Sequence, residues 1–362
     1  MSNKETAKKA MLYIIGICII AAIAFAVFVF QREDKAELHV YTWSDYISPE
    51  VVEQFEKEND CRVVIDTFDD NESMLAKMQA GATGYDVIFP SSYIIPVLNR
   101  NNLIRDIDPE LIPNVYSNFD AKFNGALHEY SMKYSVPYAF SITGIAVRRD
   151  KLAEEVLNEP VSWELLRLPV LNKRVSVLND IREMIGIGLK VNGYSLNSTN
   201  QDEIAKGAEY ATALKKAARR MDNVEYRIGL VDGTFIASIG YNSDIFQVKQ
   251  ENPEFPIEFI IPKEGSSCCW DEMCIPTSSK HQELAHRFIN FIYDEEVAAK
   301  NMEYVGSIQP NSKMWEYLSD SLNADPLVNL SKDTLGKVEL LKDVGEAIEI
   351  YNRHWDVVTN SK

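Results

Sequence analysis

Apolar and polar positions follow two periods in the first part of the chain after residue 36. Apolar side chains alternate over residues 37–43, and β-branched residues crowd 61–68, so both stretches predict strands. Ser48, Pro49 and Glu50 supply an N-cap, a first-turn proline and an acid, which predicts a helix from there. Residues 72–80 predict a second helix and 85–89 a third strand. Strands separated by helices indicate an α/β fold with a parallel sheet and right-handed crossovers.

Residues 134–149 are extended in pattern and interrupted by proline and glycine, so we expect the chain to pass there into a second lobe. Strands and helices then resume. Strands are predicted at 174–178, 234–239, 257–261 and 271–275, with a loop over 262–270, and helices at 180–192, 201–221, 281–293 and 338–358.

The N-terminus carries a different pattern. Met11 to Phe30 is an uncharged apolar run of 20 residues, long enough as a helix for a bilayer core of about 30 Å. Lysines at 4, 8 and 9 precede it, which predicts a cytoplasmic N-terminus with the body outside. An uncleaved anchor, a cleaved signal peptide and a lipoprotein signal at Cys18 all remain open, and each places the body outside the cytoplasm.

Charge narrows the choice of partners. The chain has 37 basic and 54 acidic residues, a net charge of -17. Residues 1–36 contain five basic and three acidic residues, so the body carries 32 against 51, a net of -19. A surface that acidic disfavours nucleic acid and suits cations.

Motifs for common chemistry are missing from the sequence. It lacks the glycine-rich phosphate loops and the nucleophile elbow, and its cysteines at 61, 268, 269 and 274 do not have paired metal-ligand spacing. We expect no cofactor, no metal and small buried thiols. A carboxylate-based hydrolase has no motif to exclude it and none to support it.

Parallel sheets bind ligands beyond the carboxyl ends of their strands. Those ends carry Trp43-Ser44-Asp45-Tyr46 and Pro90-Ser91-Ser92-Tyr93. Acids also stand near aromatic residues further on, with Asp180 and Glu183 one helical turn apart and Asp271 beside Trp270. Taken singly, these are a helix cap and core tryptophans; taken together they predict a site for a cation, which aromatic faces and carboxylates both attract.

Several blocks together resemble bacterial extracytoplasmic polyamine-binding proteins, the spermidine/putrescine-binding subunits of ABC importers. They are YTWSDYISPEVVEQFEKEN, NESMLAKMQAGATGYDVIFPSSY, YSVPYAFSITGIAVRRDKL and WDEMCIP, in family order. The resemblance spans nearly all of residues 37–362. It implies a two-lobed α/β fold of the type II periplasmic-binding-protein kind, hinged between lobe 1 (37–143 and 272–312) and lobe 2 (144–271 and 313–362).

The resemblance also implies ligand-binding roles for individual residues. Trp43 matches an aromatic wall, with Ser44, Asp45 and Tyr46 in the same turn, while Ser91 and Tyr93 match the loop that grips one amine. The pair Asp180 and Glu183 matches the acids at the other end of the ligand, and Asp271 the acid that meets an inner amine.

Four positions depart from the family pattern. Tyr241 replaces a usual Trp, Ser307 a usual Tyr and Leu341 a usual Gln. Cys269 stands where an aromatic is expected, and the neighbouring Trp270 is the candidate to substitute for it. Loss of rings weakens stacking on an alkyl chain, so the cationic class is predicted and the particular amine stays open.

The resemblance implies a non-enzymatic, monomeric solute-binding protein that delivers a polyamine to an ABC permease and ATPase complex. Its ligand-bridged lobes would close around the cation. Three rivals remain: another small amine, amino-acid derivative or metal as cargo, an extracellular hydrolase, and a sensor that binds ligand without a permease.

Overall fold

The structure is a computed structural model that describes residues 35–153, 156 and 160–361. The predicted membrane segment, residues 11–30, lies outside the described residues. Within the part described, no helix has the length and apolarity needed to cross a bilayer.

Strands and helices alternate along most of the chain. The strands are β1 (Ala36–Thr42), β2 (Cys61–Thr67), β3 (Val87–Ile88), β4 (Val136–Arg148), β5 (Val175–Val177), β6 (Arg220–Met221), β7 (Ala237–Tyr241), β8 (Ile257–Ile260), β9 (Ser266–Met273) and β10 (Val338–Leu340). The helices are α2 (Pro49–Asn59), α3 (Asn71–Gln79), α4 (Ile95–Arg100), α5 (Pro113–Asn118), α6 (Ile181–Val191), α7 (Gln201–Ala217), α8 (Tyr226–Asp232), α9 (Asn242–Glu251), α10 (Gln282–Ile292), α11 (Glu295–Val305), α12 (Asp320–Asn323), α13 (Lys332–Leu335) and α14 (Ile348–Asn360).

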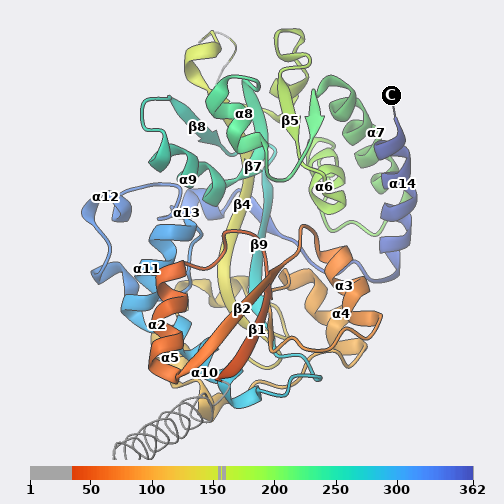
Figure 1. Cartoon of the computed structure of the whole chain (residues 1–362). Coiled ribbons are helices and arrows are strands. Elements are labelled where there is room, and N and C mark those ends of the chain that lie inside the picture. The colour runs from red at the N-terminus through yellow and green to blue at the C-terminus, as the bar shows by residue number, and fades with distance from the viewer. Residues whose placement is uncertain (1–34, 154–155, 157–159, 362) are drawn as a thin grey trace, which may run out of the picture.

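Two sheets organise the molecule (Figure 1). The first has strand order β2-β1-β3, all parallel, and is flanked by α2–α5, α10 and α11; we call this group the first lobe. The second has order β10-β9-β4-β7-β5-β6, with β8 also paired to β4. Its strands β5–β8 lie with α6–α9 and α14 in the second lobe. The predicted mixed α/β architecture is confirmed; the exact lobe boundaries stay a prediction.

Two long strands, β4 and β9, run through both lobes in Figure 1. The first part of β4 pairs antiparallel with β9, from Val136 to Ile142. The remainder, from Thr143 to Arg148, pairs with β7 and β8 in the second lobe. The extended pattern predicted for residues 134–149 is thus seen in β4, and that the chain changes lobe there stays a prediction.

Local sequence explains why the helices begin where they do. Helix α2 starts directly after Ser48 with Pro49 at its first position, and α3 is capped by Asp70, whose carboxylate accepts a hydrogen bond from Ser73 N. The amphipathic α6 is capped by Asp180 and buries nearly its whole length. Caps fix the start of each helix, and burial of its apolar face stabilises it.

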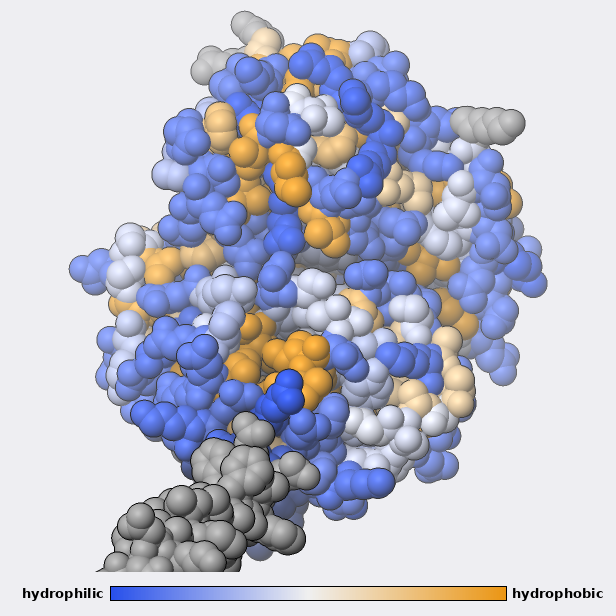
Figure 2. All heavy atoms as spheres, viewed as in Figure 1, coloured by the Kyte–Doolittle hydropathy of each residue, from blue (hydrophilic) through white to orange (hydrophobic). Residues whose placement is uncertain are grey.

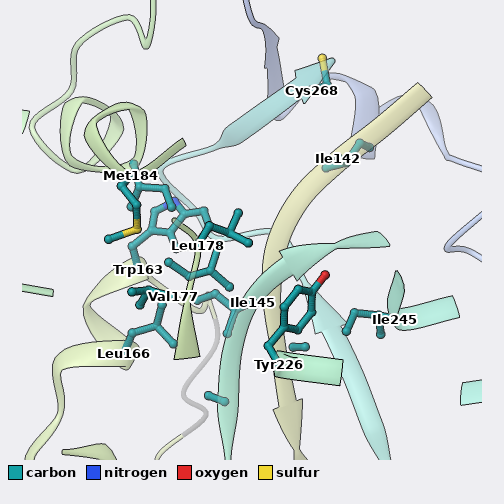
Figure 3. Close-up of a cluster of buried hydrophobic side chains, with 14 of the residues drawn as sticks. Ile142, Ile145, Trp163, Leu166, Val177, Leu178, Met184, Tyr226, Ile245 and Cys268 are labelled. Carbon is teal, nitrogen blue, oxygen red and sulfur yellow. The ribbon is translucent and has the colours of Figure 1, made fainter. Parts of the chain in front are cut away.

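Figure 3 shows part of the second lobe's hydrophobic core. Ile145 from β4 and Val177 from β5 lie there with Trp163, Met184 and Tyr226, all fully buried. The outer face in Figure 2 is mostly hydrophilic, with apolar patches that include one over α8, near exposed Val224 and Ile228. A packed core under a charged surface matches the composition.

Two predicted elements differ from the structure. Residues 338–358 were expected to form one helix, but Val338–Leu340 is the strand β10, and α14 begins only at Ile348. The reason is tertiary, since β10 pairs in parallel with Ser266–Cys268 of β9. Likewise, β9 begins at Ser266, inside the stretch 262–270 expected to be a loop.

Gly188 allows α6 and α7 to pack closely. A Cβ at residue 188 would stand 2.1 Å from the carbonyl oxygen of Gly207. We therefore expect Gly188→Ala to lower the free energy of unfolding by about 3 kcal/mol, at the upper end of overpacking costs, in urea or thermal unfolding. Gly186→Ala is the matched control, because its Cβ meets only Leu196 at 3.5 Å. That variant should be neutral or up to about 1 kcal/mol more stable. Equal destabilisation by both would contradict this account of the helix contact.

Candidate functional site

Asp271 is the centre of a hydrogen-bonded group from three segments. Along β9, Asp271 and Cys269 are partly exposed while Cys268, Trp270 and Glu272 are buried, as strand alternation requires. The carboxylate of Asp271 accepts hydrogen bonds from the Tyr46 hydroxyl at 2.5 Å and the Ser91 hydroxyl at 2.6 Å. Burial raises the pKa of Asp271 to about 6, although both hydroxyls oppose the rise. The structure thus brings together Tyr46, Ser91 and Asp271.

A second acidic group stands at the start of α6. Asp180 Oδ1 accepts hydrogen bonds from the backbone N–H groups of Arg182 and Glu183, at 2.8 and 2.9 Å. The carboxylate of Glu183 accepts one from Ser267 Oγ of β9 at 2.6 Å. Burial raises the pKa of Asp180. Burial and then the neighbouring Asp180 charge raise the pKa of Glu183 to about 7. Two buried acids in one helical turn are costly unless a cation compensates them.

The hydroxyls of two tyrosines are influenced by the acids of this region. Tyr93 lies in the first lobe and is buried; removal from water and the charges of Glu72 and Asp180 raise the pKa of its hydroxyl well above the usual value. Tyr241, at the end of β7, has its pKa raised by burial and then by Asp180 and Glu183. The charge of Asp180 therefore acts on both hydroxyls, on Tyr93 from the first lobe and on Tyr241 from the second.

Trp43 lies at the rim of the first lobe. Its indole nitrogen donates to Phe89 O at 3.0 Å, and its ring packs on Phe68 with centroids 4.4 Å apart. The partly exposed indole is held in place by these contacts, and its role as an aromatic wall stays a prediction.

Two residues of this region were not singled out in the sequence. Arg182 is fully buried, with its guanidinium 5.6 Å from the Tyr93 ring and 5.2 Å from that of Tyr351. Glu72 lies in the first turn of α3; partial removal from water and then repulsion by Asp180 raise its pKa to about 7. In the sequence, Arg182 stands between the paired acids at 180 and 183, and Glu72 stands at the start of a predicted helix. Both are ordinary in surface helices, so neither pointed to a site.

Three predicted residues lie elsewhere. Trp270 is buried on the other face of β9, where its indole donates to Ala126 O at 3.0 Å and packs on Phe123 and Phe140. It therefore does not replace the ring missing at Cys269. Ser44 and Asp45 are exposed, and Asp45 stands 3.9 Å from Arg227 of the second lobe.

The departures from the family pattern also have defined places. Cys269 Sγ lies 3.6 Å from Ser92 Oγ, Ser307 is fully buried, and Leu341 packs in the same apolar cluster as Tyr93. Small or apolar side chains thus occupy these positions.

A cavity of about 670 Å³ lies outside this group, between Asp45, Glu303 and Tyr304 on one side and α8 and α9 on the other.

We call Glu72, Tyr93, Asp180, Glu183, Tyr241 and Asp271 the interlobe site. Its carboxylates and rings come from both lobes, and in the described residues no group of three or more His, Cys, Asp or Glu side chains is arranged to hold a metal ion. Such a site can hold an organic cation by charge and by ring contact. With its two lobes and crossing strands, the molecule has the features of a hinged solute-binding protein.

Comparison with known proteins identifies the family. Residues 50–329 match the model of the bacterial extracellular solute-binding proteins, and the chain belongs to that family. The family and the periplasmic relatives below support a location outside the cytoplasm.

Relatives and solved structures agree with that assignment. The chain is 28% identical to the spermidine/putrescine-binding periplasmic protein of Salmonella typhimurium over 92% of this chain and 94% of that one. It is 29% identical to the putrescine-binding periplasmic protein PotF of Escherichia coli, over 96% and 97%. A putative spermidine/putrescine ABC transporter structure from Listeria monocytogenes superposes with a TM-score of 0.82 at 30% identity, covering 90% of this chain and 99% of that one. The predicted periplasmic-binding-protein fold and family resemblance are confirmed.

Proposed function

We propose that this protein captures a polyamine between its lobes, outside the cytoplasm, and delivers it to an ABC permease and its ATPase. The observation that carries the proposal is the interlobe site itself. Asp180 and Glu183 stand on α6 of the second lobe and Glu72 on α3 of the first. Asp271 of β9 is hydrogen-bonded to Tyr46 and Ser91 of the first lobe, and the charge of Asp180 acts on the hydroxyls of Tyr93 and Tyr241. A polyamine carries ammonium groups separated by alkyl chains, and this matches acids separated by rings. The names of the relatives support the same ligand class.

Capture follows from the division of the site between lobes. A cation that reaches both the α6 acids and Asp271 contacts all of them only when the lobes are closed. Its binding therefore favours the closed form by its differential affinity for that form. In this proposal no bond is made or broken, so the protein is a carrier and not an enzyme. We propose that it acts as a monomer.

We further propose that residues 11–30 tether the body to the outer face of the cytoplasmic membrane. A tether raises the local concentration of the carrier near a membrane-embedded permease. The mass of the mature protein from membranes tests this. A full-length chain supports the anchor, whereas a chain that begins after residue 20 supports a cleaved signal.

A thermal-shift screen of residues 37–362 tests the ligand class. Putrescine, spermidine and spermine should raise the melting temperature, because a ligand that binds only the folded state stabilises it. Lysine amide and calcium serve as a different amine and a metal for comparison. Titration calorimetry should then give a saturable heat for at least one polyamine. No heat with any of the three would overturn the proposal and favour another amine as cargo.

Affinity should depend on pH through the raised carboxyl groups. The pKa values of Glu72 and Glu183 are raised to about 7 and that of Asp271 to about 6, so in the ligand-free protein these groups take up protons as the pH falls from 8 to 6. A bound cation needs the ionised forms, so we expect affinity to fall at least tenfold over that range, by calorimetry. The stability of the ligand-free protein should change in the opposite direction to the affinity. Folded pKa values above the unfolded ones mean that ionisation destabilises it, so it should melt at a higher temperature at pH 6 than at pH 8 as far as these groups are concerned. Affinity that is constant between these pH values would contradict the role of these acids.

A further inference from the structure

Asn71, the first residue of α3, connects two segments of the interlobe site. Its side chain is 4% exposed and makes three hydrogen bonds, all to the loop after β3. Its Oδ1 accepts from the backbone N–H of Ser91 at 3.0 Å. Its Nδ2 donates to Ser91 Oγ and to Tyr93 Oη, each at 3.0 Å. Every polar atom of the amide is thus used.

The orientation of this amide is determined by chemistry. A backbone N–H can only donate, so the atom that meets Ser91 N must be the carbonyl oxygen of Asn71. The NH2 group must then face the two hydroxyls. Both hydroxyl oxygens are acceptors in these bonds, so their own protons point elsewhere.

This orientation fixes the proton of Ser91. Because Ser91 Oγ accepts from Asn71, its single proton is free to go to Asp271 Oδ1, 2.6 Å away. Asp271 Oδ2 receives the proton of Tyr46. Asp271 therefore receives two hydrogen bonds, and both favour its ionised form.

We infer that Asn71 is a positioning residue for the ligand: its amide orders the hydroxyl protons of Ser91 and Tyr93, so that Asp271 meets an incoming ammonium as a carboxylate. Because the Tyr93 oxygen also accepts from this amide, the hydroxyl proton of Tyr93 points away from Asn71. The inference deepens the proposed function and rests on it.

The other groups around Asp271 do not supply this effect. Glu272 is adjacent and repels its charge, and Tyr138 uses its own hydroxyl proton on Tyr46 O. Cys269 is a neighbouring thiol whose pKa is raised by burial and by the Asp271 charge. Glu272 is itself held on the other face of β9 by hydrogen bonds from Ser131 and Ser135, and His128 Nε2 lies 2.8 Å from its carboxylate. Ser91 and Tyr46 are therefore the hydrogen-bond donors that hold Asp271 ionised, and Asn71 orients one of the two.

Asn71→Asp is the decisive variant. Its Oδ1 still accepts from Ser91 N, so the loop stays anchored, but the second oxygen now accepts the hydroxyl proton of Ser91. Asp271 loses that donor, so its ionisation midpoint should rise by about one pH unit, the equivalent of one charge-assisted hydrogen bond. Carboxyl-carbon NMR titration of Asp271, assigned with Asp271→Asn, measures the midpoint directly. Because a smaller fraction of Asp271 is then ionised, spermidine affinity should fall about threefold at pH 6.5 and hardly at all at pH 8.5.

Ser73→Asp controls for an added charge in the same helical turn, at an exposed position outside this network. The buried charge of Asn71→Asp also repels Asp271 directly, so the uncharged Asn71→Ala is needed to separate the two effects. Ser73→Asp should raise the Asp271 midpoint by a few tenths of a unit at most. Asn71→Ala is a second variant that adds no charge. It frees the Ser91 hydroxyl to rotate and should give a rise between those of the other two.

An Asp271 midpoint in Asn71→Asp equal to that of Ser73→Asp would overturn the inference, and so would an unchanged midpoint in Asn71→Ala. The NMR measurement is made without ligand, so it tests the network even if no polyamine binds. Wild-type protein that binds none of the three polyamines would instead overturn the proposed function alone.

Discussion

Asp180→Asn combined with Glu183→Gln is expected to weaken polyamine binding by at least about 100-fold. Each change removes a charge with little change of shape. Asn caps a helix about as well as Asp, and Gln keeps an oxygen for the hydroxyl of Ser267. The fold should therefore survive while an ammonium group loses two buried carboxylates. Removal of one partner from a buried hydrogen-bonded charge pair costs about 2–5 kcal/mol, and each 1.4 kcal/mol is tenfold in affinity.

Titration calorimetry at pH 8 measures the loss, since the acids of the wild-type protein are then ionised. Asp294→Asn is the matched control for a lost capping acid. Asp294 caps α11 and accepts hydrogen bonds from Glu296 N and Val297 N, the same positions that Asp180 serves in α6. It should leave affinity within about twofold. An affinity for the double variant within threefold of wild type would show that the ammonium groups do not lie at α6.

Local signals explain which parts of this fold can be predicted from the sequence. The start of α2 follows from Pro49, whose fixed φ suits the first helical position, and the start of α6 from Asp180, whose carboxylate accepts hydrogen bonds from the first turn. The strand ends that carry Tyr46 and Ser91 follow from the parallel-sheet rule, and both side chains do meet at Asp271. In these cases the deciding interactions join residues that are close in the sequence, or they follow from the order of strands in a parallel sheet.

The remaining features depend on contacts that no local pattern contains. Val338–Leu340 is amphipathic enough for a helix, and only the free edge of β9 makes it a strand. Trp270 was proposed to turn toward the site, but the pairing of β9 with β4 sets its face, opposite Phe140. Arg182 and Glu72 are missed because their sequence positions suit exposed helix residues. Only the approach of the two lobes places them near Tyr93 and Asp180.

Asp271→Asn should weaken polyamine binding far more than Asp45→Asn, about 30- to 100-fold against threefold or less. The two substitutions change net charge equally, so the difference reports position. At 271 the amide offers one oxygen acceptor and an NH2 donor to two hydroxyls that both donate, so one of Tyr46 and Ser91 must turn away. That loss adds to the missing charge, and together they are worth about 2–3 kcal/mol.

Asp45 differs from Asp271 in its exposure and in its partner. Its side chain is 61% exposed, and its partner Arg227 stands 3.9 Å away, a pair that contributes at most about 1 kcal/mol. Its backbone is left-handed, with φ of 55°, a conformation that Asn adopts as readily as Asp, so Asp45→Asn should fold normally. Calorimetry of both variants at pH 8 and 0.15 M salt, with melting curves to verify folding, decides the matter. Equal losses would mean that the ligand meets the exposed rim as closely as the inner acid. A loss confined to Asp271→Asn places the inner ammonium at β9, where the strand passes from one lobe to the other.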